Sequence, residues 1–420
     1  MAESRTRLAV SAWATIVFAL VLGADEVRAI LPPPLFVSLA VVVVAASVLV
    51  FVRVRPDRFR WYRLPSPLYW FLAWSALSLL WSATLLPSLI GLVTVLATTA
   101  VAVALSYVLT WHELLRTLAA ALRILIGLRL AFELWSALFA GGAAADPGDP
   151  APSGFLALLA LIVWGIQLRA GLVRPFTGWF WVCVSVVAIV LAGTPMVWAG
   201  LVAVLAGLGF AMWGRRIPQH RRVPLYATAA VLFAAVSVVA IVARDALSAM
   251  LNGAGRLAGP AEAWDGVWGL VLERPAVGWG WVGAWPEQVA PFDRLQAASG
   301  PAVASAHDAW LDVWLQTGLV GLLLFAPLVV LTLFRVWFRA VDPPRRGPGP
   351  ALPYATSALW PWLAMVALMV QSVADSSILV DGGWLLLVTL AVKTRFDFAL
   401  PAQGTEPRML PWRRVPIPRG

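Results

Sequence analysis

The feature that most constrains this chain is a succession of apolar segments, each about 20 residues long, joined mostly by short polar connections. A helix of about 20 apolar residues crosses the bilayer core, which is about 30 Å thick. Applied along the chain, this length predicts about twelve membrane-spanning helices, and therefore an all-α, polytopic membrane protein. The predicted spans are residues 8–24, 31–52, 67–83, 86–110, 113–140, 153–168, 175–192, 195–213, 223–243, 308–334, 354–374 and 382–398.

The composition excludes the other classes of protein. Hydrophobic residues make up 61% of the chain and charged residues 12%. Soluble domains contain about 45–50% apolar and about 25% charged residues. So much apolar surface cannot be hidden in one soluble core, which excludes a soluble enzyme, a secreted disulfide scaffold and a disordered chain. The net charge of +10 needs a separate explanation, because a basic soluble protein would point to nucleic acid.

The distribution of the basic residues predicts the orientation. If the spans alternate from a cytoplasmic N-terminus, 24 of the 31 Lys and Arg lie in cytoplasmic segments or at the cytoplasmic ends of spans. Five lie outside, and Arg123 and Arg129 lie deeper within the fifth span. This bias places both termini in the cytoplasm. The excess of basic residues is then explained by the membrane topology, because these residues face the anionic lipids of the inner leaflet. No nucleic-acid partner is expected. The five outer arginines are Arg28, Arg244, Arg256, Arg274 and Arg294.

The expected organisation has one long extracytoplasmic loop. Helices 1–9 occupy residues 1–243, the loop occupies 244–307, helices 10–12 occupy 308–398, and a cytoplasmic tail occupies 399–420. The loop is predicted to contain short helices, one of them at 260–272. Long loops on compact scaffolds usually carry function, so the candidate residues are sought here.

Arginine and histidine are the chemically informative residues of this loop. A guanidinium group grips phosphate oxygens as a permanently charged fork, which makes Arg256 and Arg274 candidates for phosphate binding. A surface ion pair, for example with Glu273 or Asp265, is the alternative. His307 is the only histidine of the predicted outer face, and a neutral imidazole can accept a proton from a hydroxyl nucleophile. A capping or interfacial role is its alternative.

Tryptophan and glycine add to the pattern. The indoles of Trp279 and Trp281 can each offer an apolar face to a pyranose, although an interfacial aromatic belt also explains them. Gly278 and Gly280 favour a tight turn.

The fifth span contains charges of its own. Arg123, Arg129 and Glu133 are expected to face the bundle interior. Arg129 and Glu133 are four residues apart and are predicted to pair, and a lipid-phosphate pathway is the alternative.

Cofactor sites are not expected. The single cysteine, Cys183, lies within an apolar span, and the three histidines have no partner at metal-ligand spacing. The chain has no glycine loop of the nucleotide-hydrolase type. We therefore predict no metal, no disulfide and no nucleotide cofactor.

The order of these motifs resembles a known family. Gly255-Arg256, Trp264, Arg274-Pro275-x-x-Gly278-x-Gly280, and His307 with Gly318 and Gly321 downstream are similar to the O-antigen ligase and polymerase family. The resemblance covers about residues 250–335 and agrees with the predicted topology. It implies a GT-C-like membrane glycosyltransferase of the cytoplasmic (inner) membrane that serves polysaccharide biosynthesis in the cell envelope. Its donor would be a glycan on undecaprenyl pyrophosphate, its acceptor a hydroxyl of a glycan or lipid-glycan, and its reaction inverting and metal-independent.

The resemblance also implies roles for individual residues. Arg256 would bind the pyrophosphate and His307 would meet the acceptor, so these two are the catalytic candidates. The substrate-binding candidates are Arg274, Arg244, Trp279, Trp281 and Asp308, the last standing where the family usually has Asn.

Two alternatives remain open at this point. The family's outer arginines have no counterpart near Thr194 and Ser377, which leaves a non-catalytic member of the family possible. A lipid-linked saccharide transporter or flippase is the other alternative. It predicts charges through the depth of the membrane and often an internal repeat, whereas the candidates cluster on one face. The motifs do not distinguish a polymerase from a ligase.

Overall fold

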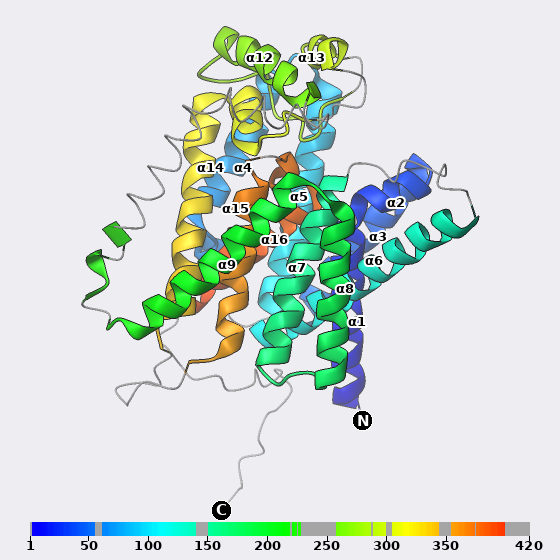
Figure 1. Cartoon of the computed structure of the whole chain (residues 1–420). Helices are drawn as coiled ribbons and strands as arrows, with labels where there is room; N and C mark the ends of the chain where they lie inside the picture. The colour runs from blue at the N-terminus through cyan, green and yellow to red at the C-terminus, as the bar shows by residue number, and fades with distance from the viewer. Residues whose placement is uncertain are drawn as a thin grey trace, which may run out of the picture.

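The computed structural model describes residues 2–54, 61–139, 150–218, 221–224, 226–227, 258–286, 289–299, 305–343, 354–373 and 375–399. Over these ranges the regular structure is helical and contains no strand, so the all-α prediction is confirmed there. Long helices form a bundle, and two short helices, α12 (Ala258–Glu273) and α13 (Phe292–Ser299), cover the end of the bundle opposite the N-terminus (Figure 1).

Most predicted spans coincide with helices of the structure. These are α1 (Ala2–Leu22), α3 (Pro33–Val54), α4 (Ser66–Leu77), α5 (Leu85–Val108), α6 (Trp111–Phe139), α7 (Pro150–Arg169), α8 (Pro175–Ala192), α9 (Pro195–Arg216), α14 (Ala309–Val341), α15 (Trp360–Gln371) and α16 (Asp381–Ala399). Five of the described helices are long and apolar enough to cross a membrane, or six if α1 and the bent-off α2 (Ala24–Ile30) form one span. The chain is therefore a multi-pass membrane protein. The predicted span 223–243 lies almost entirely outside the described residues.

The centre of the bundle is built around α5 and α16, which run side by side in the same direction. Trp384 donates its indole N–H to the Thr99 hydroxyl at 2.9 Å. Further along both helices, the ammonium of Lys393 donates to the carbonyl of Ser106 at 2.9 Å and to that of Leu109. Lys393 is the only lysine of the chain and is buried. It satisfies carbonyls that the end of α5 leaves unpaired, which is a favourable place for a cation.

An aromatic cluster joins α4, α14 and α16 to the segment that follows α12. The ring of Phe71 lies 5.5 Å from Trp281, 5.5 Å from Phe325 and 5.7 Å from Trp384, measured between centroids. All four side chains are buried. Because Trp281 belongs to the segment after α12, this packing anchors that segment directly on the bundle.

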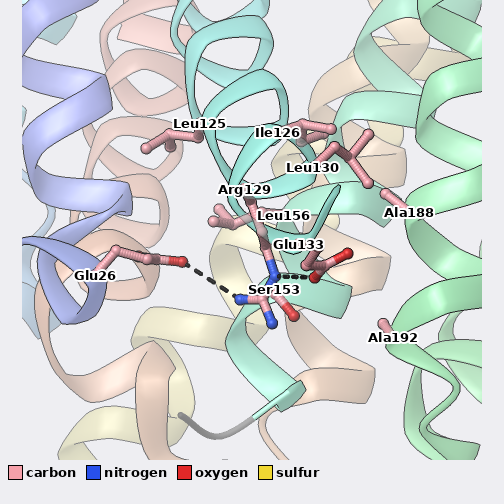
Figure 2. Close-up of a pocket in the computed structure, with 10 residues that line it drawn as sticks. All are labelled: Glu26, Leu125, Ile126, Arg129, Leu130, Glu133, Ser153, Leu156, Ala188 and Ala192. Carbon is pink, nitrogen blue, oxygen red and sulfur yellow. Dashed lines mark hydrogen bonds and ion pairs between the residues drawn. The ribbon is translucent and has the colours of Figure 1, made fainter. Parts of the chain in front are cut away.

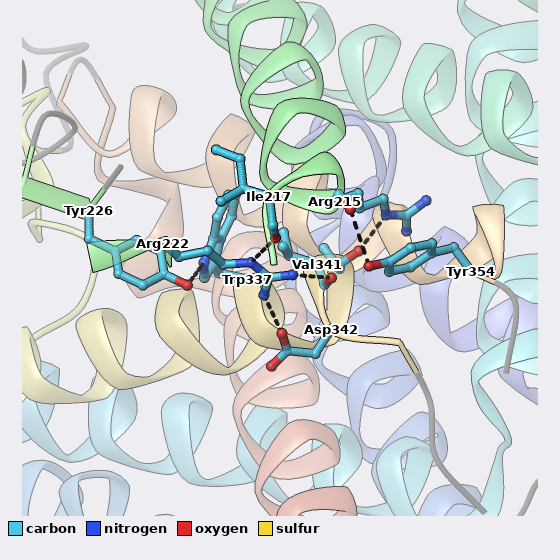
Figure 3. Close-up of polar contacts among 9 residues, drawn as sticks. Arg215, Ile217, Arg222, Tyr226, Trp337, Val341, Asp342 and Tyr354 are labelled. Carbon is cyan, nitrogen blue, oxygen red and sulfur yellow. Dashed lines mark hydrogen bonds and ion pairs between the residues drawn. The ribbon is translucent and has the colours of Figure 1, made fainter. Parts of the chain in front are cut away.

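Arginine side chains close the opposite end of α14 (Figure 3). Arg222, which is 3% exposed, pairs with Asp342 and donates from Nε to the carbonyl of Ile217 at 2.9 Å. Arg215 donates from Nε to the carbonyl of Ala340 at 2.7 Å. These guanidinium groups neutralise the last turn of α14 and hold it against the end of α9.

The contacts of Arg222 predict that replacing this residue lowers the stability of the protein, whereas replacing its neighbour Arg221 does not. Arg222→Met leaves the Ile217 and Val341 carbonyls and Asp342 without their donor, and we expect it to cost about 2 kcal/mol. Arg221 is exposed, so Arg221→Met removes the same charge with little effect. Apparent melting temperatures of both variants in detergent test this, and equal shifts would contradict the assignment.

Candidate functional site

The most unusual backbone of the structure is a break inside α14. Gly318 has φ 70° and ψ −175°, a combination open essentially only to glycine. A Cβ atom on Gly318 would lie 2.1 Å from the carbonyl oxygen of Ala276. A Cβ atom on Gly278, which has φ 69°, would lie 2.5 Å from the nitrogen of Gly318. Glycine is therefore required at both positions because two backbone segments touch.

We call this contact the loop–helix interlock and define it as residues 274–283 with residues 315–320. The break frees backbone groups of α14 from their helical partners, and the loop backbone replaces those partners. The hydrogen bonds run from the nitrogen of Trp279 to the oxygen of Leu315 (3.0 Å), Gly280 to Gln316 (2.8 Å), Leu319 to Pro275 (2.9 Å) and Val320 to Ala276 (3.3 Å). Gly278, one of the two glycines predicted to form a turn, thus also allows this close approach.

Indole groups satisfy further carbonyls of the interlock. Three Nε1–H groups donate to it: Trp74 to Thr317 at 2.8 Å, Trp81 to Val277 at 3.1 Å and Trp314 to Pro275 at 3.0 Å. Two of these tryptophans come from α4 and the turn that follows it, so α4 is tied to the interlock as well. Their role is structural, and the sequence alone did not single them out.

Two buried polar side chains of α14 hold the far end of the loop. Gln316 accepts from the amides of Val282 and Gly283 and donates to the carboxylate of Asp312, each at 2.9 Å. The same carboxylate accepts from the Trp285 indole at 2.8 Å. Asp312 and Gln316 are four residues apart in an apolar helix, and this spacing is the sequence signal that could have identified them.

His307 lies immediately before α14 and has a constrained backbone. Its φ of 48° is in the left-handed region, which non-glycine residues seldom adopt. The amide of His307 donates to the Ser305 hydroxyl at 3.3 Å, and the amide of the buried residue Ala306 faces the Asp312 carboxylate. The half-buried imidazole of His307 is therefore attached to a backbone that Ser305 and, next to Ala306, Asp312 hold in place. Backbone strain such as that of His307 concentrates at functional sites.

Asp308 holds the backbone that follows His307. Its carboxylate caps α14 by accepting from the amides of Trp310 at 2.8 Å and Leu311 at 3.0 Å. Burial raises the pKa of the Asp308 carboxyl, and these two amides act against that increase. The capping role, which was one alternative considered for His307, is thus performed by Asp308.

Arg274 is held on an aromatic face. Its guanidinium carbon lies 4.3 Å from the centroid of the Trp279 ring, and Nη1 donates to the carbonyl of Trp81 at 3.5 Å. The indole of Trp279 is itself fixed by a 3.0 Å hydrogen bond to Leu270. No described carboxylate pairs with Arg274, so its charge is not neutralised by the part of the chain that the structure describes.

Trp281 has a different position from Trp279. It is fully buried, packs edge-on against Phe71 and donates its backbone amide to the Ser78 hydroxyl at 2.9 Å. Its indole is therefore part of the packed support of the site, and neither face of the ring is exposed to a sugar. Trp279 is only half-buried and lies beside Arg274.

The remaining candidates cannot be placed. Arg256 and Arg244 lie outside the described residues, and so does the side chain of Trp264. Among the described side chains, no group of three or more His, Cys, Asp and Glu is arranged to hold a metal ion.

A small apolar core unites α12, α13, the loop and the start of α14. Its members come from all four elements, so Arg274 and His307 belong to one packed unit at the end of the bundle (Figure 1). The buried members are Val267, Leu270, Val271, Val282, Trp285, Phe292, Leu295, Ala306 and Leu315.

Comparison with known families identifies one segment of the chain. Residues 180–326, about a third of the chain, match the family model described as O-antigen ligase. The matched segment runs from α8 to just beyond the interlock and includes every site residue predicted from the sequence. The resemblance to the O-antigen ligase and polymerase family is thereby confirmed. No individually curated protein matches the chain.

Proposed function

We propose that this chain is an integral-membrane glycosyltransferase of the polymerase or ligase type. It transfers a glycan from undecaprenyl pyrophosphate to a hydroxyl of a glycan or lipid-glycan acceptor, at the outer face of the cytoplasmic membrane, with both termini inside. One observation carries the proposal: a shared apolar core and the interlock hold the segments of His307 and Arg274 in one packed unit, within the segment similar to O-antigen ligase, and no described carboxylate pairs with Arg274.

The proposed reaction is a single displacement with inversion. An imidazole nitrogen of His307 accepts the proton of the acceptor hydroxyl while its oxygen bonds to the anomeric carbon. The bond between that carbon and the pyrophosphate oxygen breaks, and its electron pair leaves with the lipid pyrophosphate. Fixed guanidinium groups stabilise this growing negative charge in the transition state, so no metal ion is needed to neutralise it.

The other candidates take supporting parts in this scheme. Arg256 is proposed to bind the pyrophosphate together with Arg274, and Arg244 to supply a further phosphate contact. Trp279 orients the Arg274 guanidinium, and its half-exposed position suits contact with a sugar. Asp308 fixes the backbone of His307 through its cap on α14.

Arg274 offers a test with a graded outcome. Arg274→Ala is expected to lower transfer at least about tenfold, because the leaving group loses a fixed charge. Arg274→Lys keeps the charge but loses the fork and the stacking on Trp279, so only part of the activity returns. Transfer is measured in vesicles supplied with lipid-linked donor.

Arg294→Ala is the matched control. Arg294 belongs to the same outer unit but is exposed on α13. Its replacement lowers the net charge equally and is expected to leave transfer unchanged. Equal losses from the Arg274 and Arg294 variants would reduce the effect to general electrostatics and overturn the assignment.

A further inference from the structure

The packed unit formed by α12, α13 and the loop exposes apolar side chains. Among its described residues before α14, three large hydrophobic side chains are exposed: Leu272 at 62%, Trp268 at 46% and Val277 at 37%. Trp268 and Leu272 are four residues apart and therefore lie on the same side of α12. Glu273, the next residue, is also exposed but points about 100° further around the helix. One side of α12 is thus apolar and exposed.

Direct contacts join this side of α12 to α14. The ring of Trp268 lies edge-on to that of Trp314, with 5.4 Å between centroids. The Pro275 carbonyl accepts both from the Trp314 indole, at 3.0 Å, and from the amide of Leu319, at 2.9 Å. Leu319 is 43% exposed, and Leu323, one turn further along, is 62% exposed. The apolar surface of α12 therefore continues onto α14, which is long and apolar enough to cross a membrane.

The loop continues the same surface onto α4. The Trp81 indole donates to the carbonyl of Val277 at 3.1 Å, and its ring lies 5.2 Å from that of Trp74 on α4. Leu80, which precedes Trp81, is 80% exposed. We call the combined surface the apolar face and define it by the exposed side chains of Leu80, Trp268, Leu272, Val277, Leu319 and Leu323.

The length of α14 indicates where this face lies relative to a bilayer. Between Asp312 and Arg335, α14 has 22 residues and none of them is charged. They span about 33 Å at 1.5 Å per residue, close to the about 30 Å of the hydrocarbon core. With Arg335 at one boundary of the hydrocarbon, residues 315–320 of the interlock lie at the other. The loop residues bonded to them, and with these the apolar face, lie at the same level.

The side of the bundle around α2 and α6 differs at this level. Residues 8–24, which include α1 after its first turns, contain no charge and span about 26 Å. Just beyond them, Glu26 lies 3.8 Å from Nη1 of Arg129, whose Nε donates to Glu133 at 3.1 Å (Figure 2). The pairing predicted for Arg129 and Glu133 is thereby confirmed. Arg123 was expected to face the interior with them, and that expectation was wrong: it is exposed on α6.

We propose that the apolar face is inserted into the adjoining leaflet of the bilayer, so that the packed unit is partly embedded in lipid. Large exposed apolar surfaces mark contacts with membranes or proteins, and this one is continuous with the membrane-spanning surface of α14. The leucines lie among acyl chains, and the indoles of Trp81, Trp268 and Trp314 lie at the headgroup boundary, where tryptophan is enriched. Arg274, bonded to the Trp81 carbonyl, then lies at the level of the lipid phosphates.

Fluorescence quenching at single cysteines tests the insertion without any glycan transfer, and therefore independently of the proposed function. Leu272→Cys in a Cys183→Ala background is labelled with a fluorophore and reconstituted in phosphatidylcholine liposomes. We expect strong quenching by brominated acyl chains and weak quenching by iodide present on both sides of the membrane. The unaltered protein labelled at Cys183, which is exposed on the apolar helix α8, gives the reference for contact with lipid.

Glu273→Cys in the same background is the matched control. It moves the label by one residue to a polar, exposed position of α12, so the order of the two quenchers should reverse. Trp268→Cys, one turn earlier on the apolar side, replaces Leu272→Cys should that variant aggregate in size-exclusion chromatography. Iodide quenching at position 272 or 268 as strong as at 273 would show a face in water. Protection from both quenchers would show a face covered by protein. Either result would overturn the proposal.

Discussion

Replacing His307 is expected to lower glycan transfer by at least about 100-fold, because a positioned general base contributes about 10²–10⁴ to the rate. His307→Asn is the most informative change. Asparagine tolerates the left-handed backbone that His307 adopts, with φ 48°, but its amide cannot accept the proton of an acceptor hydroxyl. Transfer from lipid-linked donor in vesicles is the measurement.

His112→Ala is the control for loss of a histidine. His112 is exposed near the start of α6, where its neighbour Trp111 packs against Arg339 in the last turn of α14, away from the interlock. It is expected to have no effect on transfer. If His307→Asn folds and transfers glycan normally, His307 is not the base, and the proposed mechanism fails at its first step.

Gly318→Ala is expected to cause the largest loss of stability. Its Cβ atom would lie 2.1 Å from the carbonyl oxygen of Ala276, in a backbone conformation that alanine avoids. Strain and overlap together should cost at least about 3 kcal/mol, and the interlock would open. Apparent melting temperature and the monodisperse fraction after purification in detergent measure this.

Gly209→Ala in α9 is the matched control. Nothing lies within 4 Å of a Cβ atom built there, and the residue is in regular helix. Alanine is the better helix former by about 1 kcal/mol, so this variant should be neutral or slightly stabilised. A Gly318→Ala protein as stable as the Gly209→Ala protein would show that the interlock does not hold α12 and the loop after it in place.

Local sequence rules predicted much of the fold. Apolar length alone located the segments that became α1, α3 to α9 and α14 to α16, because each bilayer-sized helix satisfies its own backbone. The helix expected at 260–272 is α12. The pairing of Arg129 with Glu133 followed from their spacing on one helix face.

The interlock could not be derived in this way, because it depends on contacts distant in sequence. Gly318 appeared in the sequence as part of a family pattern, but its partner Ala276 is 42 residues earlier. The same limit applies to Trp281, because its residue type suits sugar binding but its side chain is buried against Phe71. Periodicity reports which face of an element is apolar, and not which distant segment covers it.

The most direct test of the central claim uses the purified, unaltered protein in proteoliposomes that contain undecaprenyl-pyrophosphate-linked glycan and an acceptor glycan. The account predicts an extended glycan and an equal amount of released undecaprenyl pyrophosphate, with the anomeric configuration inverted and the rate unchanged by a metal chelator. Movement of intact donor across the bilayer without product, or recovery of unreacted donor, would contradict it.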